Sequence, residues 1–188
     1  MQKEIITING NLGSGKSSTA NLVAQKLGYT RFSSGDFFRQ VGIELGLSVI
    51  DLNIRAETDG NIDKMTDEKV RSMRNKEKIV IDSRTAYYWI PESFKVYLDL
   101  PPEIAKNRIM KSLKENKLRQ ETEKETTAEE VYKRMNERYE SEQKRYWELY
   151  KIDSTDMSNY DLVIDTNKNN LEEVVSAILL EYKKWKEN

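Results

Sequence analysis

Short apolar runs rich in β-branched residues recur along the chain, and the segments between them repeat apolar residues every three or four positions. The runs are typical of buried strands, and the longer repeats are typical of amphipathic helices. Five runs predict strands, at Glu4–Asn9, Tyr29–Phe32, Ile79–Asp82, Lys95–Asp99 and Asp161–Asp165. Strands that alternate with helices predict an α/β fold, in which helices cover a mostly parallel sheet.

Two segments between these strands predict additions to the sheet. Residues 48–76 have a helical pattern with weak amphipathicity, which predicts a small cap. Residues 116–127 are almost wholly polar, with Leu118 as their one apolar residue, and predict a loop or flap between two helices. We therefore expect one domain over residues 1–188, with a core at 1–34, 77–115 and 128–188, a cap at about 35–76 and a lid at about 116–127.

The composition excludes several classes of function. Among the 188 residues, 31 Lys and Arg nearly balance 32 Asp and Glu, so no overall basic field favours nucleic acid. The chain has no Cys and no His, which excludes disulfides, thiol chemistry and catalysis or metal binding by histidine. Neither a signal-peptide core nor an apolar stretch long enough to span a bilayer is present. We expect a cytoplasmic protein, with a monomer favoured and no membrane or nucleic-acid partner.

An eight-residue motif follows the first predicted strand and opens the first predicted helix. Residues 10–17 fit the phosphate-loop pattern G-x-x-x-x-G-K-[ST] in the strand–loop–helix context that the pattern requires. In such a loop, backbone N–H groups face a phosphate, Lys16 reaches the β- and γ-phosphates, and the Ser17 hydroxyl binds Mg²⁺. A glycine-rich turn with a chance Lys-Ser is the simpler alternative, but motif and context agree. The predicted ATP-binding residues here are Gly10, Asn11, Leu12, Gly13, Ser14, Gly15, Lys16, Ser17 and Ser18.

Polar residues also follow the second and third predicted strands. Ser34 can cap the helix that begins there, and Asp36 and Arg39 share a face near its N-terminus. Taken alone, that segment is interpreted more simply as a helix cap with a local ion pair. Asp82 and Arg84 end the third strand, at the edge where open α/β sheets bind ligands, so that Asp82 would approach Mg²⁺ through water and Arg84 would clamp a phosphate.

The predicted helix at about 128–150 combines a charged face with an apolar stripe. The charged residues fall within roughly 80° of one another on a helix, and they are Arg134, Arg138, Glu142 and Arg145. A solvated ladder of salt bridges is one interpretation of that face, and a phosphate-binding border of a cleft is the other. The stripe is expected to pack on the core, and it comprises Tyr132, Met135, Tyr139, Tyr146 and Tyr150.

Five segments, in order from residue 4 to residue 166, resemble those of nucleoside monophosphate kinases. Ser-Ser-Gly-Asp-Phe-Phe-Arg at 33–39 resembles the signature of adenylate and cytidylate kinases, which implies that Asp36 orients Mg²⁺-bound water and Arg39 holds the acceptor phosphate. Residues 137–146 and 150–166 are similar to the short, archaeal-type cytidylate kinases. There the resemblance implies that Arg138 and Arg145 hold phosphates and that Glu142 reads the cytosine.

The resemblance implies a P-loop NTPase fold with three α/β/α layers and a five-stranded parallel sheet, and a kinase that transfers the γ-phosphoryl group of ATP to CMP or dCMP with Mg²⁺. The implied catalytic residues are Lys16, Arg84, Arg138 and Arg145, with Arg119 from the flap as a further contributor. The implied acceptor site is Ser34, Asp36, Arg39, Asp82, Arg84, Arg138, Glu142 and Arg145, and the metal site is Ser17, with Asp36 and Asp82 acting through water. Arg108 and the loop at 166–168 would lie near the adenine.

Two departures from the family pattern and two alternatives remain. Ser83 stands where the family usually has Gly, and Thr85 stands where bacterial cytidylate kinases often have Asp. A kinase for AMP, UMP or a non-nucleotide metabolite could use the same scaffold, because the phosphate-holding residues do not select a base. A nucleotide-binding switch without acceptor activity is the other alternative, although it would not need the acceptor-phosphate residues.

Overall fold

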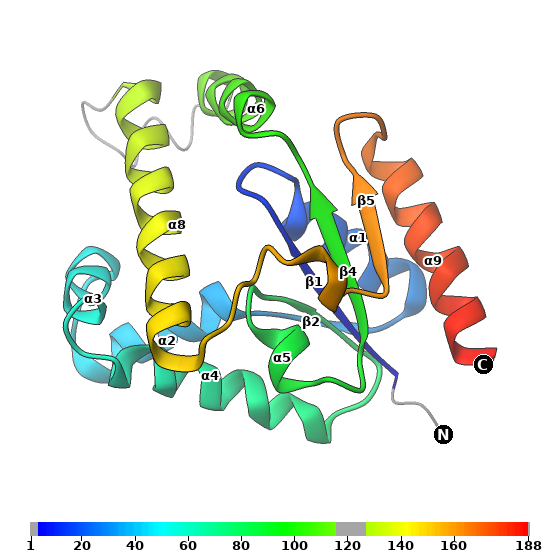
Figure 1. The fold of residues 1–188 in the computed structure, drawn as a ribbon, viewed down its shortest axis with the longest axis horizontal. Helices are drawn as coiled ribbons and strands as arrows, with labels where there is room; N and C mark the ends of the chain where they lie inside the picture. Colours follow the sequence, from blue (N-terminus) through cyan, green and yellow to red (C-terminus); the bar gives the residue numbers. More distant parts are fainter. Residues whose placement is uncertain (1–3, 116–126, 188) are drawn as a thin grey trace.

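The computed structural model describes residues 4–115 and 127–187, in which a five-stranded parallel sheet lies between helices (Figure 1). The strand order is β2-β3-β1-β4-β5, and every pair is parallel. The strands are β1 (Ile5–Gly10), β2 (Thr30–Ser33), β3 (Ile79–Asp82), β4 (Phe94–Asp99) and β5 (Leu162–Asp165). All five predicted strands are confirmed, and so is the α/β fold with parallel pairing.

Helices connect the strands and cover both faces of the sheet. They are α1 (Lys16–Leu27), α2 (Ser34–Leu45), α3 (Val49–Ala56), α4 (Asn61–Ser72), α5 (Ala86–Trp89), α6 (Pro102–Glu115), α8 (Ala128–Tyr150) and α9 (Leu171–Glu187), with 3₁₀ turns η1 (Met73–Asn75) and η2 (Met157–Asn159). The main core lies where α1 and α9 pack on one face, and a second cluster lies where α4 and α5 meet the other. No helix in the described ranges is long and apolar enough to cross a membrane.

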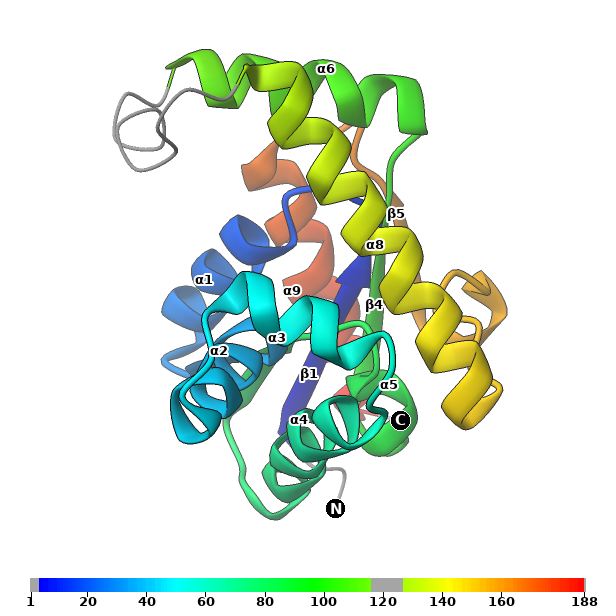
Figure 2. The ribbon, with the colours of Figure 1, turned by 90° about the vertical axis from the view of Figure 1, so that its left-hand side faces the viewer.

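The helices α2, α3 and α4 gather at one end of the molecule and form the cap (Figure 2). They pack on one another through their own buried cluster of Phe38, Val41, Leu52, Ala56 and Ile62. The segment predicted to be helical, residues 48–76, therefore forms α3, α4 and η1. Most of the predicted flap, residues 116–126 with Arg119, lies outside the described residues.

The expectation that Ser34 is the N-cap residue of helix α2 is wrong. Ser34 does not cap α2, because it is the first helical residue and Ser33 holds the N-cap position, without a side-chain cap hydrogen bond. Strand β2 runs directly into α2, so that no loop residue separates them. The Ser34 hydroxyl instead donates across to the carbonyl oxygen of Asp82, at 3.5 Å.

The first loop leaves the sheet in tight contact with strand β4. The Asn11 N–H donates to the Leu98 carbonyl at 3.1 Å. Gly10 has φ of +156°, and a Cβ added there would lie 2.3 Å from the same carbonyl oxygen. Only glycine fits this position without a shift of the backbone. The close approach aims the following loop over the carboxyl ends of the strands.

Candidate active site

The predicted phosphate loop joins β1 to α1, and its lysine folds back over it. Lys16 Nζ donates to the carbonyl oxygens of Gly10 at 2.8 Å and Asn11 at 3.2 Å. Desolvation lowers the pKa of Lys16 to about 7, and the charge of Arg84 adds to this effect, while Asp82 and Glu142 oppose it. Among the described residues, Lys16 donates to these two carbonyl oxygens and forms no ion pair. Its side chain is therefore suited to an incoming phosphate.

The end of β3 comes into direct contact with this loop, as the strand-end rule predicts. The Ser17 hydroxyl donates to Asp82 Oδ2 at 2.7 Å, and Arg31 Nη2 donates to the same oxygen at 2.9 Å. A hydroxyl beside a carboxylate fits Mg²⁺, which usually takes one or two carboxylates together with waters and phosphate oxygens. Arg31 was not predicted, and its only signal in the sequence is a charged residue within a short strand.

A cavity of about 270 Å³ opens beside this pair, between the loop, the cap and α8. Its basic lining residues are Lys16, Arg31, Arg39, Arg84, Arg138 and Arg145. Its acidic lining residues are Asp36, Asp63, Asp67, Asp82 and Glu142. Helix α8 runs diagonally past the sheet (Figure 2), and its residues Arg138, Glu142 and Arg145 line the cavity. The structure therefore brings all the predicted acceptor-site residues together around one space with Lys16 and Ser17 of the phosphate loop, and adds Arg31, Asp63 and Asp67.

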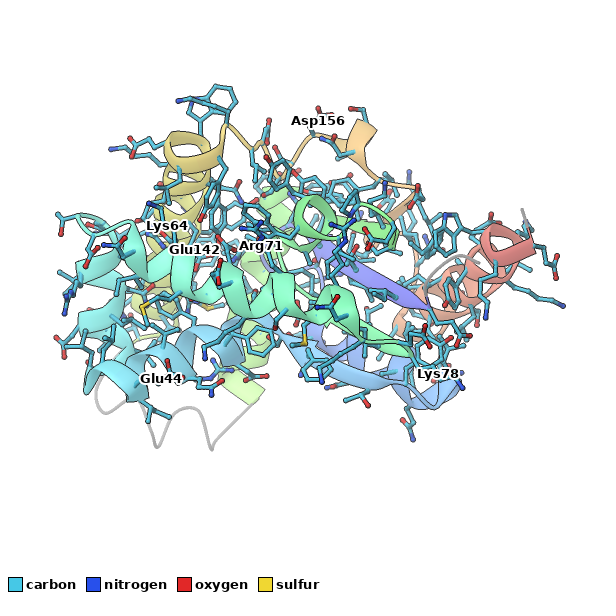
Figure 3. The ribbon with its side chains drawn as sticks, turned by 90° about the horizontal axis from the view of Figure 1, so that it is seen from below. Glu44, Lys64, Arg71, Lys78, Glu142 and Asp156 are labelled. Carbon is cyan, nitrogen blue, oxygen red and sulfur yellow. The ribbon has the colours of Figure 1, made fainter. Side chains whose placement is uncertain are left out.

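Glu142 lies between two of the predicted phosphate-binding arginines. Its carboxylate accepts from Arg138 Nε at 2.8 Å and forms an ion pair with Arg84, and Figure 3 shows it between α8 and the cap. Although burial works against ionisation, the charges of Arg84 and Arg138 hold the pKa of Glu142 below its usual value. Burial also works against the charge of Arg84, but Glu142 raises its pKa. Glu142 and Arg84 therefore each favour the charged form of the other.

Arg145 is bound to Asp63 of the cap and to Ser141 of its own helix. Its Nε donates to Asp63 Oδ2 at 2.7 Å, its Nη2 lies 3.4 Å from Asp63 Oδ1, and its Nη1 donates to Ser141 at 2.7 Å. Asp63 and Arg145 are both buried, and burial raises the pKa of Asp63 although the contact with Arg145 opposes the shift. This ion pair joins α4 to α8.

Asp67, one turn after Asp63 on α4, holds the segment that follows β3. It accepts a hydrogen bond from Thr85 Oγ1 at 2.9 Å, and burial raises its pKa to about 6. Ser83 occupies the position of the family's glycine without positive φ, since the described non-glycine residues with positive φ are Lys78 and Lys151. The sequence contained a signal for Asp63 and Asp67, because they are four positions apart and therefore lie on one face of a predicted helix.

Asp36 and Arg39 line the rim of the cavity. They form an ion pair with each other, and both side chains are more than half exposed. This is the local pair that the segment alone predicts, now placed beside Ser17, Asp82 and the other arginines. Both residues remain available to a ligand that enters the cavity.

A second hollow, of about 340 Å³, lies on the outer side of the phosphate loop. Arg108 of α6 lines it together with Ile109, Met135, Gly13 and Gly15 to Ser18. Arg108 Nη2 donates to the carbonyl of Thr166 at 2.6 Å, so the two segments predicted to lie near an adenine are in contact. The position fits a group attached to the phosphates that the loop holds.

The charged face of α8 borders the cavity, which is the second of the two interpretations that the sequence allows, whereas the apolar stripe is less deeply buried than expected. The tyrosines and Met135 of the apolar stripe are only partly buried, whereas Glu142 and Arg145 on the neighbouring face are buried. The reason is that α8 spans the cavity and the cap, so its charged face turns inward. Arg134, grouped with that face, does not line the main cavity; it borders a separate groove between α3 and α8.

The chain is similar to known kinases in sequence and in fold. Residues 5–168 match the model of the cytidylate kinase-like family. The cytidylate kinase of Natronomonas pharaonis is 39% identical over 86% of this chain and 80% of its own, and that of Archaeoglobus fulgidus is 35% identical over 96% and 97%. Among solved structures, a shikimate kinase from Aquifex aeolicus is similar in fold, with a TM-score of 0.57, 20% identity and 96% of both chains covered.

Proposed function

Because the chain belongs to the cytidylate kinase-like family, we propose that it transfers the γ-phosphoryl group of ATP to the phosphate of CMP or dCMP, giving ADP and CDP or dCDP. One observation carries the proposal. The phosphate-loop residues Lys16 and Ser17 line the same cavity as Arg39, Arg84 and Arg138, so a donor phosphate and an acceptor phosphate can meet there.

The reaction needs alignment and charge stabilisation more than covalent help from the protein. An anionic oxygen of the acceptor phosphate attacks the γ-phosphorus, while the bond from that phosphorus to the β–γ bridging oxygen breaks and the oxygen leaves with ADP. No general base is required, since the attacking oxygen already lacks a proton. Lys16 contacts the β- and γ-phosphates, and Arg84 and Arg138 stabilise the charge that spreads over the moving group.

The divalent cation has a matching set of protein oxygens. Ser17 would hold Mg²⁺ through its hydroxyl, and Asp82 and Asp36 would hold it through water. When bound there, the cation would supply positive charge that neutralises the phosphates. Arg31 keeps the Asp82 carboxylate turned toward Ser17, since both donate to the same oxygen.

An incoming acceptor phosphate competes with Glu142. Arg84 and Arg138 already bind this carboxylate, so the phosphate must share the two guanidinium groups with it. Arginine has five N–H donors, which allows one guanidinium to serve both anions. Glu142 thereby keeps the two arginines ordered before the acceptor arrives.

The test is a coupled ADP-release assay with ATP and each of CMP, dCMP, UMP, AMP and GMP, with Lys16→Ala as the control. We expect the highest kcat/KM with CMP or dCMP, and a loss of roughly 10²–10³-fold or more in Lys16→Ala with the circular dichroism spectrum unchanged. Equal rates across the panel would refute the assignment of the acceptor. Tight ATP binding without ADP release from any acceptor would favour a nucleotide-binding switch.

A further inference from the structure

We propose that Asp63 and Arg145 together read the cytosine edge of the acceptor, a role that rests on the proposed function and differs from the assignment of base reading to Glu142. The pair comes from two elements that border the cavity, α4 and α8. It combines a carboxylate acceptor and a guanidinium donor side by side, and the two side chains are 4% and 7% exposed.

The contact between the two side chains is asymmetric. One leg, from Arg145 Nε to Asp63 Oδ2, is 2.7 Å long, and the other, from Nη2 to Oδ1, is 3.4 Å long. The shorter leg and the bond from Nη1 to Ser141 hold the guanidinium in place. The longer leg leaves an acceptor oxygen and a donor N–H with unused capacity, since a carboxylate offers about four acceptor positions and a guanidinium five N–H groups.

An adjacent acceptor and donor match cytosine and mismatch uracil. The cytosine 4-amino group can donate to Asp63 Oδ1, and cytosine N3 can accept from Arg145 Nη2. Uracil presents a carbonyl oxygen at position 4 and an N–H at position 3, so each contact would join two acceptors or two donors. Adenine presents the same donor and acceptor order as cytosine, and the pair therefore discriminates CMP from UMP without discriminating it from AMP.

Glu142 lies among the residues proposed to bind the phosphates. It is bound by Arg84 and Arg138, and its charge acts on Lys16, which the γ-phosphate must also reach. A carboxylate at that point would face the acceptor phosphate and not the base. Asp63 lies on the cap helix α4 that also carries Asp67, where it is near enough to Glu142 for the charge of Glu142 to act on it.

The experiment measures kcat/KM for CMP and UMP in the wild type, Asp63→Asn and the matched variant Glu142→Gln. In Asp63→Asn the amide oxygen can still accept from Arg145, while the amide nitrogen can donate to the uracil 4-oxygen. We expect the CMP-to-UMP ratio to fall roughly 10- to 100-fold in Asp63→Asn. Glu142→Gln should lower both values together and leave the ratio within about threefold.

A substrate-side arm does not depend on how Asp63→Asn folds. The 2-pyrimidinone riboside monophosphate lacks the 4-amino group, and we expect it to lower kcat/KM roughly 10- to 100-fold against CMP in the wild type and in Glu142→Gln, but by much less in Asp63→Asn. An equal loss for CMP and UMP in Asp63→Asn would show a purely structural ion pair and overturn the proposal. So would a penalty for the analogue that disappears in Glu142→Gln. A wild type without any preference for CMP over UMP would instead refute the proposed function itself.

Discussion

Asp67 provides a quantitative test of how the cavity tolerates buried carboxylates. The residue is 4% exposed, and burial raises its pKa from 3.8 to about 6. The folded chain therefore binds this proton more tightly than the unfolded chain does, so that stability decreases as the pH rises from about 4 to about 6. Above pH 6 the loss is complete, and about two pKa units at 1.36 kcal/mol each amount to about 3 kcal/mol.

The variant Asp67→Asn removes this cost, because its amide cannot ionise and its carbonyl oxygen can still accept from Thr85. We expect the variant to be more stable than the wild type by about 3 kcal/mol at pH 7, with the advantage shrinking as the pH falls toward 4. For a chain of this length the gain corresponds to a Tm roughly 6–12 °C higher. Urea and thermal unfolding, followed by circular dichroism from pH 4 to pH 8, measure both quantities.

The matched control is Glu68→Gln, at the next position on the same helix. Glu68 is 77% exposed and forms only a surface contact of 3.8 Å with Arg71, so its loss should change stability by no more than about 0.5 kcal/mol at any pH. An Asp67→Asn variant that is no more stable than the wild type at pH 7 would refute the reasoning. So would a stability difference that does not change with pH.

Two further predictions concern the phosphate loop. Gly10→Ala should lower the free energy of unfolding by about 3 kcal/mol or more, because its Cβ would clash with the Leu98 carbonyl. Gly28→Ala should lower it by about 1–2 kcal/mol, because Gly28 has a positive φ but lies in open space. Equal costs in urea unfolding would contradict this account. Since Lys16 has a pKa of about 7 without ligand, ATP binding at pH 8.5 should take up close to one proton. Calorimetry in two buffers of different ionisation enthalpy measures the proton uptake, and Lys16→Met should abolish it. A binding enthalpy that does not depend on the buffer would disprove the uptake.

The sequence alone predicted the sheet and the phosphate loop well, for physical reasons. The runs of β-branched residues mark strands because buried parallel strands need apolar residues on both faces. That Ser17 and Asp82 lie close together was also predicted, because parallel strands end at one edge of the sheet, although their direct hydrogen bond was not. Each of these features is determined within one segment or by strand direction.

The partners of the arginines could not be predicted in the same way. The pairing of Arg145 with Asp63 and of Glu142 with Arg84 depends on where α8 lies relative to the cap and the sheet. The hydrophobic periodicity of the sequence does not determine the distance or the angle between α8 and these elements. The same lack of a local signal explains why Arg31 was missed and why the pattern of α8 alone left open whether its charged face borders a cleft or the solvent.

The hydrogen bonds of the cavity join distant parts of the chain, and this has a consequence for folding. Ser17 and Asp82 are 65 residues apart, Arg84 and Glu142 are 58 apart, and Asp63 and Arg145 are 82 apart. Closing such long loops costs entropy that is recovered only after the intervening elements have packed. The acceptor site therefore forms late, and a partly folded chain cannot hold the nucleotide. Nucleotide binding consequently favours the finished fold over every incomplete one.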